Sequence, residues 1–203
     1  MFFDDGYIKY CAKHEMIKNF DFGDGFSTQI AEILKTRDYL HKLGLIGVYP
    51  NGIGFGNCSF RAKNNEFIIT GSATGEIENL QKNDLCLVEK FDIAKNFVCS
   101  KGSIQASSES MTHGAIYSAN PKINCVLHIH SRKIFDYMKT AGNFNFTAEN
   151  IPYGTPEMAF VVMDEVKKIE KNNGIMVMLG HDEGVISFGK TIATALSEIE
   201  RVM

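Results

Sequence analysis

Two histidines spaced by one residue, His128 and His130, give the sharpest chemical signal in the sequence. They belong to the end of an apolar run that begins at Ile123 and is typical of a buried strand. Because side chains alternate along a strand, both imidazoles point to the same face. Two such imidazoles can chelate one metal ion, with bonds of about 2.0–2.1 Å. The alternative is a hydrogen-bonded or surface pair, and the spacing alone leaves both open.

An upstream polar segment, Ser107–Ser110, is expected to open a helix. Two hydroxyls and free backbone N–H groups at a helix N-terminus form a natural anion site. Glu109 would lie in the first turn, where the helix dipole favours a carboxylate. The plainer interpretation makes Ser108 only a helix cap and Glu109 only a dipole partner. His113 shares the helix face of Glu109, and we interpret it as a group that hydrogen-bonds locally rather than as a metal ligand.

Three further segments could contact an anion or a metal. Gly52–Asn57 offers backbone N–H groups with little steric hindrance, and Thr70–Gly75 combines hydroxyls with glycines. Neither is a Walker loop or a dinucleotide fingerprint, because the required lysine and glycine spacings are missing. The third segment, Leu179–Gly184, is either a ligand-bearing loop or an ordinary acidic turn. It carries three potential metal ligands, His181, Asp182 and Glu183.

The groups named above must be positioned by helices and strands, and the sequence predicts both kinds of element. Helical spacing of apolar residues predicts a helix over Ser27–Leu43, closed by Gly44. Thr155, Pro156 and Glu157 form a strong helix start. Other helices are expected at Ser108–Ala119, at Ile134–Met138 up to Gly142, and at Ile192–Ile199, with strands at Phe67–Thr70, Leu85–Glu89, Asn96–Cys99, Ile123–Ile129, Ile175–Leu179 and Val185–Phe188. This mixture indicates an α/β or α+β fold.

Length and composition fit one globular domain over residues 1–203, with residues 1–25 as a peripheral N-terminal extension. The 44% hydrophobic and 22% charged fractions exclude a disordered chain, a collagen-like fibre and a coiled coil. A net charge of -3 argues against nucleic-acid binding, which needs a clustered basic surface.

The sequence also predicts the compartment. No apolar run reaches the ~20 residues of a membrane helix. Met1–Tyr10 carries Asp4 and Asp5 where a signal peptide has basic residues, so we expect a cytoplasmic protein without membrane contact. The five cysteines are odd in number and form no CxxC pair, and we interpret them as reduced, mostly buried thiols.

Taken together and in this order, the motifs resemble the class II aldolase and adducin head family. Gly56–Arg61 is similar to its GN-S-R segment, and Ile69–Ser72 is similar to its ITPSG or ITPTG loop. Ser107–Glu109 with His113 resembles its PSSE segment, and His128–Ser131 resembles its HxHS motif. The resemblance spans about Ile30 to Ile199 and rests chiefly on the last two motifs.

This resemblance implies a three-layer α/β/α domain around a largely antiparallel sheet. It implies a divalent metal on His128 and His130, usually zinc, with a third ligand near His181. Glu109 would match the catalytic carboxylate. The substrate phosphate would be bound by residues that match the family's contacts: Gly56, Asn57, Ser72, Ser107 and Ser108. The family enzymes are commonly tetramers, so a homo-oligomer is expected.

The sequence departs from the family in four places. The family has His-Gly at the third ligand, whereas here Glu183 precedes Gly184; we favour His181 as the ligand, with Glu183 as the alternative. Gly71 and Ala73 alter the ITPSG loop. Ala106 replaces the proline that precedes the serine pair in the family. The C-terminal tail that carries a catalytic tyrosine in fuculose-phosphate aldolase is not matched, because the given sequence ends at Met203.

The function implied by the resemblance is metal-dependent aldol cleavage or condensation of a small phosphorylated keto sugar, through a metal-stabilised enediolate. Zn²⁺ is favoured, and Mn²⁺, Co²⁺ or Fe²⁺ would also suit such donors. The alternatives are an epimerase, dehydratase or decarboxylase on the same site, or a non-catalytic adducin-like interaction module. Epimerases of the family carry Asp where this sequence has Glu109, which favours the aldolase.

Overall fold

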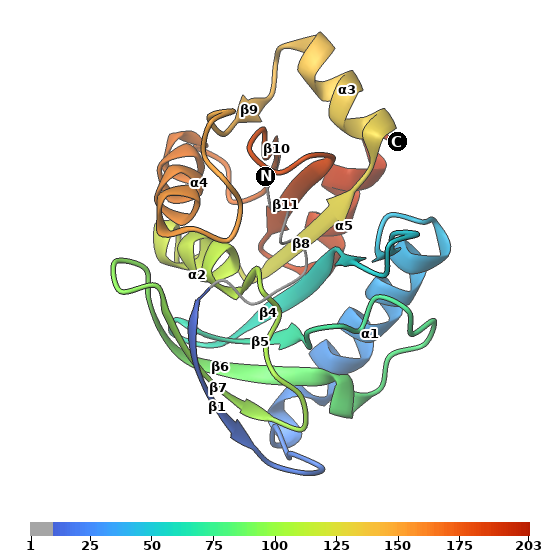
Figure 1. Cartoon of the computed structure of the whole chain (residues 1–203), viewed down its shortest axis with the longest axis vertical. Coiled ribbons are helices and arrows are strands. Elements are labelled where there is room, and N and C mark those ends of the chain that lie inside the picture. Colours follow the sequence, from blue (N-terminus) through green and yellow to red (C-terminus); the bar gives the residue numbers. More distant parts are fainter. Residues whose placement is uncertain (1–9) are drawn as a thin grey trace.

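A nine-stranded sheet forms the centre of the molecule, with strand order β1-β7-β6-β5-β4-β8-β11-β10-β9, and a separate ribbon pairs β2 with β3 (Figure 1). The structure is a computed structural model that describes residues 10–203, so the expectation for Met1–Tyr10 lies, apart from Tyr10, outside the described residues. The strands are β1 Cys11–Met16, β2 Gly47–Val48, β3 Gly54–Phe55, β4 Asn57–Lys63, β5 Glu66–Thr70, β6 Leu85–Asp92, β7 Phe97–Gly102, β8 Cys125–His130, β9 Asn145–Phe146, β10 Gly174–Val177 and β11 Gly184–Gly189.

Helices cover both faces of this sheet and give the fold three layers (Figure 1). One apolar core joins α1, α3 and α5 to one face of the sheet, and a second core joins α2 and α4 to the other. The helices are α1 Ser27–Lys42, α2 Ser110–Ala119, α3 Arg132–Ala141, α4 Pro156–Lys168 and α5 Ile192–Glu200, with 3-10 helices at Asp24–Phe26 and Lys82–Asp84. None of the helices within residues 10–203 combines the length and apolar character needed to cross a bilayer.

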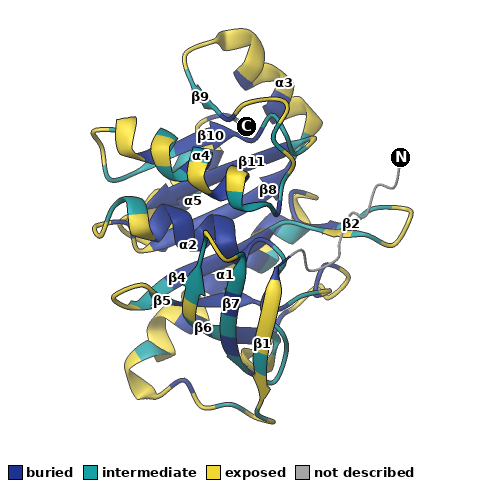
Figure 2. Ribbon diagram, turned by 60° about the vertical axis from the view of Figure 1, so that its left-hand side comes forward, coloured by how far each residue is buried: buried dark blue, intermediate teal, exposed yellow. Residues whose placement is uncertain are grey.

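The sheet is mixed, which corrects the expectation of a largely antiparallel one. β1 pairs parallel with β7, and β9 pairs parallel with β10, while the inner pairs are antiparallel. A parallel pair needs a crossover connection, and α4 supplies it between β9 and β10. The sequence patterns missed both edge strands because β9 has two residues and β1 is mostly exposed (Figure 2).

Helix boundaries follow local signals, and most of the expected ones are confirmed. Ser131 and Thr155 cap α3 and α4 by accepting hydrogen bonds from backbone N–H groups three residues later. Gly142 closes α3 in the left-handed conformation with φ 69°, and Gly44 follows α1 with φ 71°. All five cysteines are free thiols.

The start of α2 differs from the expectation. Glu109, not Ser108, occupies the N-cap position, and no side chain caps this end. The hydrogen bonds converge instead on Ser107: its Oγ accepts from the Glu109 N–H at 3.3 Å, and its carbonyl accepts from the Ser110 N–H at 3.1 Å. The polar turn before α2 is therefore organised around Ser107, and the prediction of Ser108 as the cap was wrong.

Strand β8 is buried along its whole length and lies in the middle of the sheet (Figure 2). Cys125, Leu127 and Ile129 pack into the core on the α1 side, and Val126 packs into the core on the α2 side. Alternation therefore turns the last two polar side chains of β8 toward the α2 side of the sheet.

Candidate metal centre

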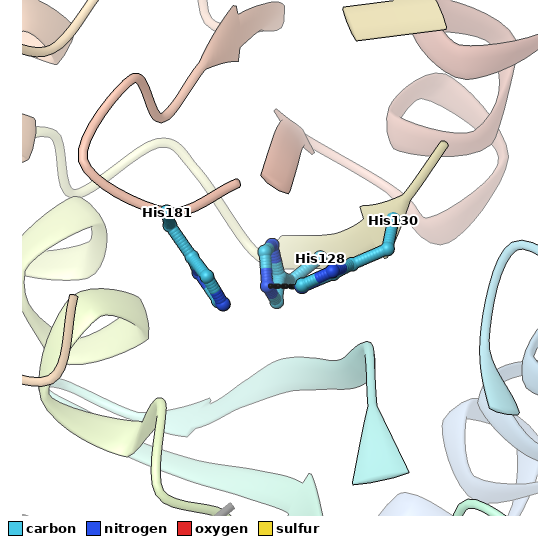
Figure 3. A group of neighbouring side chains, drawn as sticks. All are labelled: His128, His130 and His181. Atoms are coloured by element: carbon cyan, nitrogen blue, oxygen red, sulfur yellow. Dashed lines mark hydrogen bonds between the residues drawn. The ribbon is translucent and has the colours of Figure 1, made fainter. Parts of the chain in front are cut away.

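Three histidines from two places in the chain meet at the end of β8. His128 and His130 share one face of the strand, and His181 lies in the turn that precedes β11 (Figure 3). The ring centroid of His181 lies 5.0 Å from that of His128 and 4.5 Å from that of His130. One nitrogen from each of the three rings lies within 4.8 Å of the others.

The turn between β10 and β11 delivers the third imidazole. His181 N–H donates to the Met178 carbonyl at 2.9 Å, and Gly184 N–H donates to the His181 carbonyl at 2.8 Å. Glu183 takes a positive φ of 62°, so the chain turns sharply before β11 begins. Gly184 then pairs with His130 across the sheet, which places the turn beside the histidine pair. The structure thus brings His181 into the group, and Glu183 is not part of it.

The hydrogen bonds at the outer nitrogens fix which nitrogens face inward. His128 Nδ1 lies 3.1 Å from the Val185 carbonyl, which can only accept, so Nδ1 carries the proton. His130 Nδ1 lies 2.8 Å from the Tyr49 hydroxyl. The two Nε2 atoms face each other at 3.0 Å (Figure 3). With both rings neutral and protonated at Nδ1, two lone pairs would point at the same place, where one cation could accept both.

Burial keeps these rings neutral. It lowers the pKa of His128 from 6.5 to about 4, and the hydrogen bond to the Val185 carbonyl partly opposes this shift. Burial also lowers the pKa of His130 well below its ordinary value, and the neighbouring His128 adds to the effect. A proton shared between the rings is therefore unfavourable at neutral pH, because the charged form is poorly solvated.

The donor set fits a divalent metal. Two nitrogens bound to one tetrahedral ion at about 2.0–2.1 Å lie about 3.3 Å apart, close to the spacing of the two Nε2 atoms. His128, His130 and His181 would hold the ion, and nitrogen-rich sites of this kind suit zinc. Glu109 lies next to the group, with its Oε1 3.8 Å from His181 Nδ1.

Glu109 is almost entirely buried, with 3% of the residue exposed. Its Oε2 accepts a hydrogen bond from Thr112 Oγ1 at 3.1 Å, one turn along α2. This contact fixes the carboxylate at the helix N-terminus, where the dipole favours negative charge. The expected catalytic carboxylate and the three histidines therefore share one site.

A pocket of about 1080 Å³ opens over this site. Its wall contains the histidines, Glu109 and every residue that the sequence assigned to phosphate contacts: Gly56, Asn57, Ser72, Ser107 and Ser108. The Oδ1 atom of Asn57 is buried without a hydrogen-bond partner in the described part of the chain, so it can accept from a ligand. Gly56 has φ 76°, and a Cβ there would come within 3.1 Å of the His128 carbonyl, so this close approach requires glycine.

A buried arginine that the sequence analysis missed supports the pocket wall. The Arg37 side chain is 1% exposed and reaches from α1 to the loop that follows β5. Its guanidinium donates to the carbonyls of Thr74 (2.8 Å) and Ile77. The loop that carries Ser72 is thus held against α1 by hydrogen bonds from the Arg37 side chain to the carbonyls of the loop. No spacing rule in the sequence links these segments.

His113 has a role outside the histidine group. Its Nδ1 lies 2.7 Å from Ser59 Oγ, which also contacts the Tyr117 hydroxyl at 2.7 Å. Burial lowers its pKa well below 6.5, with His128 adding to the effect. His113 does form a hydrogen bond, but the expectation of a local partner was wrong, because Ser59 is 54 positions away. Arg61 of the GN-S-R segment binds the carbonyls of Ile123, Tyr117 and Asn120, so it supports the end of α2.

Two tyrosines without a motif complete the site. Tyr49 contacts both His130 and Glu183. Tyr153 stacks on His181, with centroids 4.0 Å apart and an interplanar angle of 12°. Isolated tyrosines in loops carry no spacing signal, so neither could be found from the sequence.

Comparisons with solved structures agree with this architecture. An L-fuculose-1-phosphate aldolase from Thermus thermophilus is 22% identical, with 86% of each chain covered and a TM-score of 0.60. A second L-fuculose 1-phosphate aldolase is 19% identical, covering 87% of this chain and 82% of its own, with a TM-score of 0.66. A sugar-phosphate aldolase from Thermotoga maritima is 16% identical, covering 88% and 91%, with a TM-score of 0.65. At these identities the likeness is one of fold.

Family membership rests on the sequence model of the class II aldolase and adducin N-terminal domain. No curated protein matches the chain. The family model matches residues 31–203, which include both histidine-bearing segments and Glu109. The chain therefore belongs to the class II aldolase and adducin N-terminal domain family.

Proposed function

We propose that this chain is a metal-dependent lyase that cleaves or forms a carbon–carbon bond in a small phosphorylated keto sugar. One observation carries the proposal: three histidine nitrogens converge within 4.8 Å beside a buried carboxylate, at the base of a pocket lined with hydroxyls and glycines. Membership of the class II aldolase family supports this class of reaction.

His128, His130 and His181 would hold the ion, proposed as zinc. When bound, the cation would polarise the carbonyl oxygen of the substrate and stabilise the negative charge that develops there during bond cleavage. The neutral rings are ready to bind at pH 7 because burial disfavours their protonation. Tyr153 limits the movement of the third ligand by stacking on it.

Glu109 would move the proton. Its carboxylate is fixed by Thr112 and lies beside His181, so it faces the place where the reacting carbon would lie. It would take a proton from the carbon next to the carbonyl in the direction of bond formation, and return it after cleavage. Burial shields this carboxylate from water and keeps it close to the reacting atoms.

The phosphate would be bound by neutral groups rather than by a basic patch. Ser72, Ser107 and Ser108 offer hydroxyls on the pocket wall. Asn57 begins β4, the strand that flanks β8 on the side away from β11, and it pairs with His128. Gly56 directly precedes it in the chain. The proposal also includes a single domain over residues 1–203 and a cytoplasmic location. It further includes a homo-oligomer, with a tetramer favoured, and light scattering tests this oligomeric state.

The first test is the metal content per chain of protein purified without added metal or a histidine tag. About one zinc or other transition metal per chain is expected, together with cleavage of a phosphorylated keto sugar into two carbonyl products. Products that are isomers of the substrate would instead support an epimerase, and loss of water would support a dehydratase. Absence of metal after incubation with zinc and manganese would contradict the proposal and favour an interaction module.

A further inference from the structure

Tyr49 lies between a proposed metal ligand and a carboxylate. Its hydroxyl oxygen is 2.8 Å from His130 Nδ1 and 2.9 Å from Glu183 Oε2. These three side chains come from the loop after β2, the end of β8 and the turn before β11. The contacts form a continuous chain from the Glu183 carboxylate through Tyr49 to Nδ1 of His130, the ring nitrogen that does not face His128.

The donor inventory gives this chain one direction. A carboxylate only accepts, so the Tyr49 hydroxyl gives its single proton to Glu183. The Tyr49 oxygen must then accept from His130, which places the ring proton on Nδ1. The lone pair of His130 is left on Nε2, the atom that faces His128 at 3.0 Å.

Both ends of the chain are anchored. The Tyr49 ring packs on Phe55 with centroids 4.5 Å apart. Glu183 Oε1 lies 3.4 Å from Arg132 Nε at the start of α3. The Glu183 side chain is 26% exposed, so its carboxylate is partly shielded from water without being isolated from it. These contacts limit rotation of Tyr49 and Glu183, and they hold the hydroxyl against His130.

We propose that Tyr49 and Glu183 are positioning residues that set the tautomer and orientation of His130, so that its Nε2 is presented to the metal. This rests on the proposed metal site. Partners that bind the outer nitrogen of a ligating histidine fix its tautomer and raise its basicity. The proposal also gives Glu183 a role at the position where the family has its third ligand: its carboxylate acts through Tyr49 and His130 instead of binding the ion.

The test compares Tyr49→Phe, Glu183→Gln and the double variant with the wild type. Asp182→Asn is the matched control, because Asp182 also binds Arg132 but does not contact Tyr49. Tyr49→Phe keeps the aromatic ring and removes only the hydroxyl. Zinc affinity is measured by competition with a chelator, and the fold is checked by circular dichroism.

Each single variant should weaken zinc binding by roughly 10–100-fold, the range for loss of such a partner. The double variant should lose little more than the stronger single variant, since both changes break one chain of hydrogen bonds. Asp182→Asn should stay within about twofold of the wild type. Additive losses would mean that Tyr49 and Glu183 act independently, and a Glu183→Gln effect far larger than that of Tyr49→Phe would make Glu183 a direct ligand. Either result would overturn the proposal.

The tautomer can be measured without metal, which separates this proposal from the proposed function. Nitrogen-15 NMR of the metal-free protein should show His130 protonated at Nδ1 in the wild type, with its signals assigned by their loss in His130→Ala. Tyr49→Phe should shift this ring toward the other tautomer. If the wild type binds no zinc, the proposed function fails while this spectrum still decides the tautomer. An Nδ1-protonated His130 that persists in both single variants would overturn the positioning role.

Discussion

Acidification of the metal-free protein should remove a large part of its free energy of unfolding. Burial lowers the pKa of His113, His128 and His130 in the folded state below the ordinary 6.5. In the unfolded chain these rings are hydrated and regain the ordinary pKa. Below pH 6.5 the unfolded state therefore binds protons that the folded state does not, so stability falls as the pH falls.

His128 gives the magnitude. Its pKa falls from 6.5 to about 4, a difference of 2.5 pH units, and each unit corresponds to about 1.4 kcal/mol. This ring alone should cost about 2 kcal/mol at about pH 5 and about 3 kcal/mol once the pH is below 4. His113 and His130 shift in the same direction and add to the loss. Typical domains have about 5–15 kcal/mol in total, so the change should be easy to measure.

The assay is urea unfolding followed by circular dichroism in the presence of a chelator, at several pH values between about 7 and 5. The free energy should fall by more than about 1.4 kcal/mol per pH unit near pH 5.5, because more than one proton is taken up on unfolding. His128→Gln should have a shallower slope by about one proton. Asp21 and Asp92, whose pKa values are lowered by lysine contacts, titrate below this window. A free energy that stays constant from pH 6.5 to 5 would refute the argument from burial.

Three further predictions concern single side chains. His128→Ala should abolish stoichiometric metal binding while circular dichroism shows a folded domain; full metal content in this variant would remove His128 from the site. Glu109→Gln should keep the metal and lower turnover by at least ~100-fold, the lower range for general acid–base catalysis, and unchanged steady-state kinetics would exclude this role. Arg37→Met should lower the free energy of unfolding by at least ~2 kcal/mol, because the Thr74 and Ile77 carbonyls lose their buried donor. Urea unfolding measures this loss, and a variant as stable as the wild type would contradict it.

Local chemistry made several elements predictable. Thr155 and Pro156 fix the start of α4, and Gly142 fixes the end of α3, because capping involves only residues within one turn. The shared face of His128 and His130 was predictable for the same reason, since alternation along a strand is a local property. The match of several motifs in one order allowed the family to be recognised, and the family model confirmed it.

The edges of the sheet were less predictable. β9 has two residues and β1 is mostly exposed, so their pairing depends on the strands beside them rather than on their own sequence. The start of α2 also moved, because Ser107 accepts the hydrogen bonds that were expected at Ser108.

The sequence by itself determined the helices, the histidine pair on one strand face, the family and most of the buried central strands, but not β4, whose residues were read only as part of the GN-S-R segment. Only the tertiary structure decided which group completes the site. His181 and Glu183 are two positions apart, and the sequence favoured His181 while leaving Glu183 as the alternative; the turn geometry brings His181 to the histidine pair and directs Glu183 to Tyr49. Tyr49 meets His130 across 81 positions, and such contacts are set by strand order and register, which no local spacing encodes. Burial, which sets the pKa values of the imidazoles, likewise exists only once the layers have packed.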